Sequence, residues 1–290
     1  MPPSEPSTAM IRTLLASALA LPFLLACGGG MADGGNGGST AGGMSRAPAE
    51  EDAAGWRRRL ATAVQAPWEG RFRSAWEGEA PQEGRFVRLA SDRFQVRLRT
   101  ALTRHEPDGA VTEQDIQVEI GCDGEELRIL LPAVLGAGPT LATLPASRLG
   151  ALEEVDPQGQ ASQFRPDALS PWHLLQRTLD YGRPVSSGLV EERQQLELAV
   201  PAGTLARFAK EEDVGALLRL DEEGRPAMLV LQASGRRLQV DFLDLAPADA
   251  AAAGSMRIEA PAGATALPLG GLVDADLEAA NAIDLDQLGY

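Results

Sequence analysis

The sequence predicts a mainly β fold of the α+β class, with about nine to eleven antiparallel strands and two or three helices. Long segments alternate apolar with polar residues, which is typical of strands with one packed and one solvated face. Turn pairs such as Asp123-Gly124 and Ser234-Gly235 separate these segments. No strand–helix–strand rhythm is visible, which argues against a doubly wound parallel sheet.

Two segments have helical spacing. In residues 50–66, Trp56, Leu60 and Val64 recur at steps of four, and Pro67 follows. A second helix begins at Ser170, with serine as N-cap and proline at the first helical position. It places Trp172, Leu175 and Leu179 on one face.

The strand pattern occupies most of the remaining chain. Alternation is clearest in residues 72–76, 94–102, 116–122, 127–131, 196–200, 229–231 and 238–242, and residues 256–261 form an expected last short strand. Residues 270–290 form an acidic segment, which is predicted to be a loose or weakly helical extension. We therefore expect one β domain over residues 51–269.

Composition limits the possible partners. The chain has 290 residues, 44% of them hydrophobic, and a net charge of −15. An acidic surface repels nucleic acid and anionic lipid headgroups, so neither is expected as a partner. Two cysteines and two histidines, widely spaced, match no zinc motif.

The N-terminus has the order of a signal peptide over residues 1–26. Met10-Ile11-Arg12 precedes an apolar run that is shorter than the roughly 20 residues of a membrane span. The run ends in Leu24-Leu25-Ala26-Cys27, which resembles a bacterial lipobox. The resemblance implies cleavage after Ala26 and attachment of acyl chains, palmitate among them, to the Cys27 thiol. The alternative is an ordinary secretory signal with a chance cysteine.

The residues after the cysteine agree with an anchored protein. Residues 27–50 are rich in glycine and small polar residues, so they form a flexible tether of roughly 25 Å average span. Two or three acyl chains give stable anchoring, at about 0.8 kcal/mol per buried CH₂. Gly28 stands where aspartate marks inner-membrane retention in enteric lipoproteins, so the resemblance implies an outer-membrane address facing the periplasm.

The order of features resembles the LolA/LolB/LppX/RseB-like envelope proteins. An amphipathic helix leads a run of antiparallel strands, a helix containing Pro171, Leu174 and Leu175 interrupts them, and a meander over 221–242 follows. The resemblance implies a curved half-barrel sheet with helices over its concave face and an apolar cavity for acyl chains. LolA itself is soluble, whereas this chain carries a lipobox, as LolB does.

The alternating apolar residues have two interpretations. They either pack a core or, in part, line a lipid cavity beneath the second helix. The cavity candidates are Phe94, Val96, Leu98, Ile129, Leu131, Trp172, Leu175, Leu179, Leu229 and Leu231.

No catalytic set is recognisable. His105 lies in a predicted polar loop, and His173 has no serine or cysteine nucleophile placed near it by a motif. Cys122 is in phase with the apolar residues of its strand and is expected to be buried. The acids Asp274, Asp276, Glu278, Asp284 and Asp286 do not have EF-hand spacing. No enzyme activity and no cofactor are expected.

These observations favour a non-enzymatic, membrane-anchored protein that binds a lipid or an acylated partner. A second hypothesis is an RseB-like sensor or adaptor that binds a protein through its sheet and acidic tail. A third, an enzyme, requires polar residues clustered in a pocket.

Overall fold

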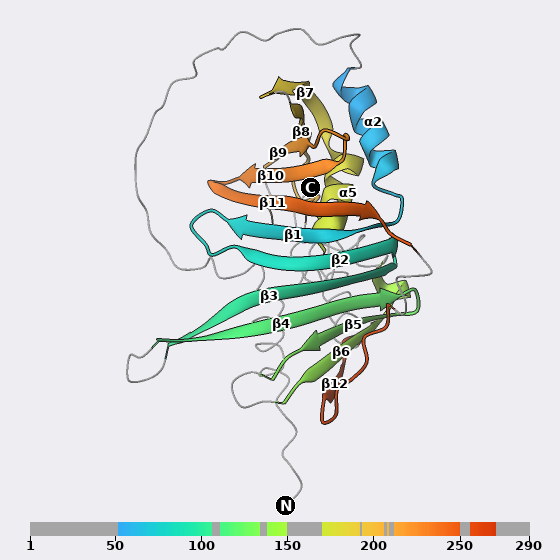
Figure 1. Ribbon diagram of the computed structural model, residues 1–290, viewed down its shortest axis with the longest axis vertical. Helices are drawn as coiled ribbons and strands as arrows, with labels where there is room; N and C mark the ends of the chain where they lie inside the picture. The colour runs from blue at the N-terminus through green and yellow to red at the C-terminus, as the bar shows by residue number, and fades with distance from the viewer. Residues whose placement is uncertain are drawn as a thin grey trace, which may run out of the picture.

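In the part of the chain that the structure describes, twelve strands form one open sheet (Figure 1). The computed structural model describes residues 52–105, 111–133, 138–149, 170–191, 193–205, 208, 212–249 and 256–270. The strands are β1 (Trp68–Trp76), β2 (Gln82–Ala90), β3 (Arg93–His105), β4 (Val111–Asp123), β5 (Glu126–Leu131), β6 (Thr140–Pro145), β7 (Arg183–Val190), β8 (Arg193–Val200), β9 (Val214–Leu220), β10 (Pro226–Ala233), β11 (Arg236–Pro247) and β12 (Thr265–Pro268). The helices are α2 (Ala53–Ala63) and α5 (Pro171–Tyr181).

The sheet consists of two meanders that meet at one strand pair. Its order is β12-β6-β5-β4-β3-β2-β1-β11-β10-β9-β8-β7, so β1–β6 and β7–β11 each follow chain order. The first strand pairs with the last of the second meander, with Phe72 opposite Phe242. All neighbours are antiparallel except β12, which is parallel to β6.

Short turns set the register between neighbouring strands. Ser234 and Gly235 connect β10 to β11, and both have positive φ, 49° and 72°. This is the geometry of a two-residue turn whose twist matches that of the flanking strands. Leu229, Leu231, Leu238 and Val240 therefore share one face of the sheet.

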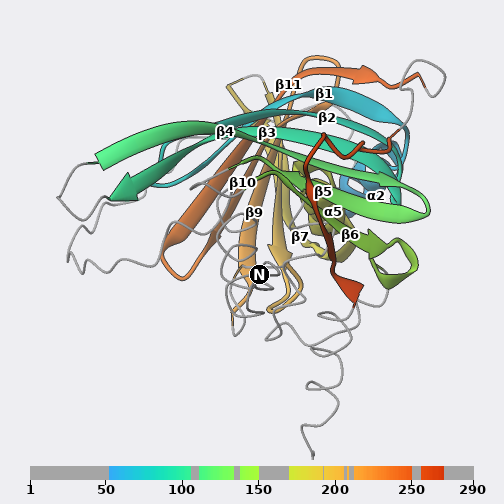
Figure 2. The same cartoon turned by 90° about the horizontal axis from the view of Figure 1, so that it is seen from below.

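The two helices lie together on this face. Asp52 caps α2 by accepting a hydrogen bond from the Gly55 N–H at 2.7 Å. Arg57 of α2 donates to the carbonyl oxygens of Leu179, Asp180 and Gly182, where α5 ends and its carbonyls lack helical partners. Figure 2 shows the sheet curving around α5. We call the helix side of the sheet its inner face.

The mainly β class, the open antiparallel-rich sheet and the two main helices agree with the sequence. The strand number is one above the expected range, because β6, β7 and β12 have weak alternation. Residues 256–261, expected as a strand, have no ladder partner, and β12 forms a few residues later. His105, expected in a loop, ends β3 opposite Val111. The helix expected over 50–66 spans Ala53–Ala63.

Candidate functional site

The ten apolar residues expected to line a cavity all lie in one continuous buried cluster. Leu131 is the most exposed of them, at 6%, and the others are at 2% or less. They come from β3, β5, β10 and α5, so the sheet and the helix bring together residues that are far apart in the sequence. In this structure they pack as a core, and their contact with an acyl chain stays a prediction.

Trp172 is at the centre of this cluster. Its ring centroid lies 5.2 Å from Phe86, 5.7 Å from Phe242 and 5.8 Å from Trp68. Its indole N–H donates to the Val64 carbonyl at 3.1 Å, which satisfies the one polar atom of a fully buried side chain. The residue therefore joins α5 to α2 and to both meanders.

A buried polar pair lies beside Trp172. Arg88 points from β2 into the inner face, and its guanidinium donates to the carbonyl oxygens of Val64, Gln65 and Ala66, which directly follow α2. Burial lowers the pKa of Arg88, and the charge of Asp180 opposes this effect. The positive charge compensates for carbonyls that the helix end leaves unpaired.

His173 is the second member of this pair. Its Nε2 lies 3.0 Å from the Ser91 carbonyl oxygen, which can only accept, so Nε2 carries the proton. Its Nδ1 is buried without a partner in the described part of the chain. Burial, reinforced by the charge of Arg88, lowers the pKa of His173 to about 3. The imidazole is therefore neutral and acts as a packing group against Phe94, at a centroid distance of 4.6 Å.

The inner face extends well beyond the helices. The backbones of α2 and α5 lie closest to β7 and β8, while Trp172 and His173 of α5 reach β2 and β3. Across the first meander the same face continues as a strip of buried aliphatic side chains, which we call the β3–β6 strip: Leu98, Ile116, Val118, Ile129, Leu131 and Leu144.

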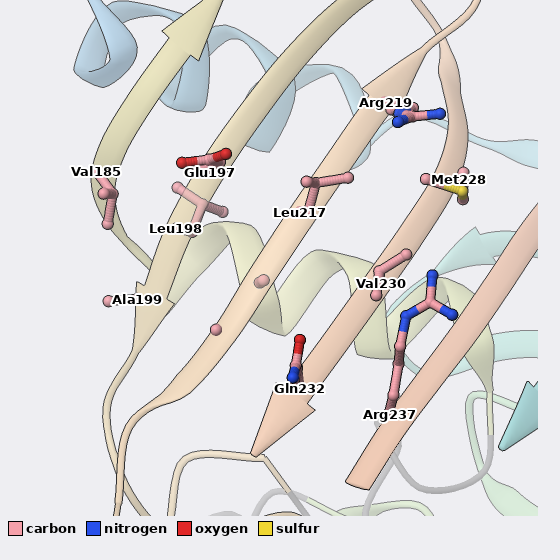
Figure 3. Close-up of a pocket in the computed structure, with 12 residues that line it drawn as sticks. Val185, Glu197, Leu198, Ala199, Leu217, Arg219, Met228, Val230, Gln232 and Arg237 are labelled. Atoms are coloured by element: carbon pink, nitrogen blue, oxygen red, sulfur yellow. The ribbon is translucent and has the colours of Figure 1, made fainter. Parts of the chain in front are cut away.

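The opposite, outer face has a hollow over β7–β11, with a volume of about 480 Å³. Leu217, Met228 and Val230 project from β9 and β10 into it, on the side of the sheet away from α5 (Figure 3). Arg219, Arg237 and Glu197 also line it. None of the residues that line this hollow is among those that the sequence predicts as site residues.

The other chemical candidates do not converge. Among the described residues there is no cluster of histidine, cysteine and acidic side chains that could hold a metal. Cys122 is fully buried, and burial raises the pKa of its thiol to about 11. No helix in the described ranges is long and apolar enough to cross a membrane. Residues Ala26 and Cys27, the tether and the five acids of the tail lie outside the described residues.

No family model matches the chain, and no curated protein matches it. Solved structures similar to it include LprF from Mycobacterium bovis, with a TM-score of 0.42 and 10% identity over 73% of this chain and 97% of that one. LppX from Mycobacterium tuberculosis has a TM-score of 0.39 and 9% identity, over 68% of this chain and 97% of that one. A LolA superfamily protein from Nitrosomonas europaea has a TM-score of 0.30 and 13% identity, over 69% of this chain and 95% of that one. LppX and LolA are among the proteins that the sequence resembles, and the proposals below depend on this chain's own residues.

Proposed function

We propose that this chain is a non-enzymatic envelope lipoprotein whose sheet binds an acyl chain of a lipid or of a lipidated protein. Acyl chains on Cys27 hold it to a membrane, with residues 27–50 as the tether. The observation that carries the binding proposal is the apolar inner face, which is wider than the two described helices can cover.

The dimensions support this argument. Twelve strands at about 4.8 Å spacing make a sheet roughly 50 Å wide. An 11-residue helix is only about 16 Å long and about 10 Å across. The backbones of α2 and α5 lie closest to β7 and β8, and Trp172 and His173 of α5 reach as far as Phe86 on β2 and Phe94 on β3. We infer that the β3–β6 strip is the part of the face that a ligand can use.

An acyl chain on this strip is held by exclusion of water. A chain laid along Leu98, Ile129 and Leu131 exchanges water for apolar contacts, at about 0.8 kcal/mol per CH₂. These three side chains are buried in the structure, so a ligand can contact them only after they become exposed.

The test uses the chain from residue 28, purified and analysed for bound lipid by mass spectrometry, followed by titration with a fluorescent fatty acid. We expect a co-purified lipid and saturable uptake. Leu131→Phe enlarges a side chain of the β3–β6 strip and is expected to reduce uptake, whereas the control Leu217→Phe, on the outer face of β9, is expected to leave uptake unchanged. No bound lipid together with no uptake contradicts the proposal.

The anchor has a separate test. Cells grown with radiolabelled palmitate are expected to label the full chain, and Cys27→Ser is expected to abolish the label. Fractionation of the membranes then tests the outer-membrane address. Labelling that persists in Cys27→Ser refutes the lipobox interpretation.

A protein partner is a second candidate, favoured by the sheet edge at β7. Val185, Leu189 and Val190 are 64%, 48% and 39% exposed, and no charged residue lies between Pro184 and Val190. Uncharged edge strands can pair with a strand of another chain. A stoichiometric partner that is recovered in a pull-down and lost in Ser187→Pro, which removes an edge N–H, supports this function. Recovery unchanged by Ser187→Pro argues against pairing at β7.

A further inference from the structure

The outer face changes character between the two meanders. Over β3 it carries Gln95, Arg97 and Arg99, the usual polar face of an antiparallel strand. Over β9 and β10 it carries Leu217, Met228 and Val230, and Val230 is only 8% exposed. The runs 216–218 and 228–231 are therefore continuously apolar, which is typical of strands that are covered on both faces.

Two cations flank this apolar floor. Arg219 donates to the Gln195 side-chain oxygen at 3.3 Å, and Arg237 donates to the Gln239 side-chain oxygen at 3.2 Å. Both partners are neutral amides, and neither arginine has a carboxylate partner in the described part of the chain. Glu197, the acid of the hollow, already accepts from Ser186 and Gln195. The hollow thus suits an aliphatic segment that carries carboxylates.

The chain itself contains such a segment. Residues 271–290 hold five carboxylates and neither lysine nor arginine. In the stretch IDLDQL, Ile283 and Leu285 alternate with Asp284 and Asp286, which in an extended backbone puts aliphatic side chains on one side and carboxylates on the other. We propose that residues 283–288 lie extended in the outer-face hollow of the same chain, with their carboxylates near Arg219 and Arg237.

The number of residues between Gly270 and the hollow determines which part of 271–290 can reach it. Gly270 follows β12, which is eight strand spacings from β10 and nine from β9 in the sheet order, or about 40 Å. Thirteen residues from Gly270 to Ile283 span at most about 45 Å when extended. The similar alternation at 273–278 ends only about 26 Å from Gly270, so it falls short of the hollow.

Photo-crosslinking in the chain from residue 28 tests this proposal, which is independent of the proposed lipid function. A photoreactive amino acid at Gln232, an exposed position lining the hollow, is expected to crosslink to residues 283–290, as identified by mass spectrometry. The matched control is the same amino acid at Gln117, an exposed glutamine on the outer face of β4, which is expected to give no such product.

Charge and partner controls complete the test. Arg219→Gln with Arg237→Gln is expected to lower the crosslink yield about two- to fivefold per arginine, and Arg99→Gln to leave it unchanged. Mixed heavy- and light-isotope chains are expected to give products within one chain only. Products between chains, products outside 283–290, or a yield indifferent to both arginines overturn the proposal.

Discussion

Acidification is expected to weaken the fold through His173. Its side chain is buried, its Nε2 donates to the Ser91 carbonyl, and its Nδ1 has no partner among the described residues. The charge of Arg88 also acts on the ring. Protonation adds a second N–H with no acceptor and a second positive charge beside the guanidinium. Both effects disfavour the imidazolium in the folded protein and are absent after unfolding.

The size of this effect follows from the two pKa values. In the unfolded chain the pKa is near 6.5, and in the folded chain it is about 3. The unfolded state therefore binds a proton that the folded state does not, so the contribution is complete above pH 6.5 and is lost as pH falls towards 3. The linkage between protonation and folding lowers the free energy of unfolding by about 2 kcal/mol between pH 7 and pH 5. At lower pH this loss approaches a limit of about 5 kcal/mol.

Urea unfolding followed by tryptophan fluorescence measures this loss. The matched variant is His173→Gln, whose side-chain amide can still donate to Ser91 but does not titrate. The wild-type free energy of unfolding minus that of the variant is expected to fall by about 2 kcal/mol between pH 7 and pH 5. Equal pH dependence in the two proteins refutes the reasoning. If the variant does not fold, NMR titration of the wild-type ring decides, because a ring that titrates above pH 5 also refutes it.

Three further predictions concern packing. Gly84→Ala is expected to destabilise the folded protein by about 1–3 kcal/mol, because a Cβ there comes within 2.5 Å of the Phe72 ring. In the control Gly188→Ala the new Cβ meets nothing within 4 Å, so its effect on stability is expected to be close to zero. Thermal melts of the two variants test this difference. Leu175→Ala is expected to cost about 2–5 kcal/mol in urea unfolding, and a cost below 1 kcal/mol contradicts a packed site beneath α5. The Cys122 thiol, with its pKa raised to about 11, is expected to resist alkylation at pH 8 until the chain unfolds; rapid labelling of the native protein argues against its burial.

The sequence predicts the elements that repeat a simple period. The alternation over 94–102 and 116–122 gives β3 and β4, and Pro171 gives the start of α5. Strand β7 escapes prediction because RPVSSGLV has little alternation, and its side chains are mostly exposed on an edge of the sheet. The pairing of β1 with β11 is not predictable from local pattern, since it joins residues about 170 positions apart in the chain.

The candidate site also contains residues that the sequence predicts and residues that it does not. Periodicity identifies the apolar residues of the inner face, because one face of a packed strand must be apolar. It does not reveal Arg88, whose burial depends on where α2 ends in three dimensions. The outer hollow did have a sequence signal, the unbroken apolar run 228–231, which breaks the alternation expected of a strand with one solvated face.

The two meanders therefore offer two separate surfaces. In the β7–β11 meander the inner face is covered by helices, and the outer face has an apolar floor over β9 and β10. In the first meander the outer face over β3 is polar, and the apolar residues are those of the inner β3–β6 strip. A ligand on the strip and the tail in the hollow are thus on opposite faces and in different meanders. Deletion of residues 271–290 is expected to leave fatty-acid uptake unchanged, and Leu131→Phe to leave the Gln232 crosslink unchanged. If either change affects both measurements, the two surfaces are coupled and the separation proposed for them is wrong.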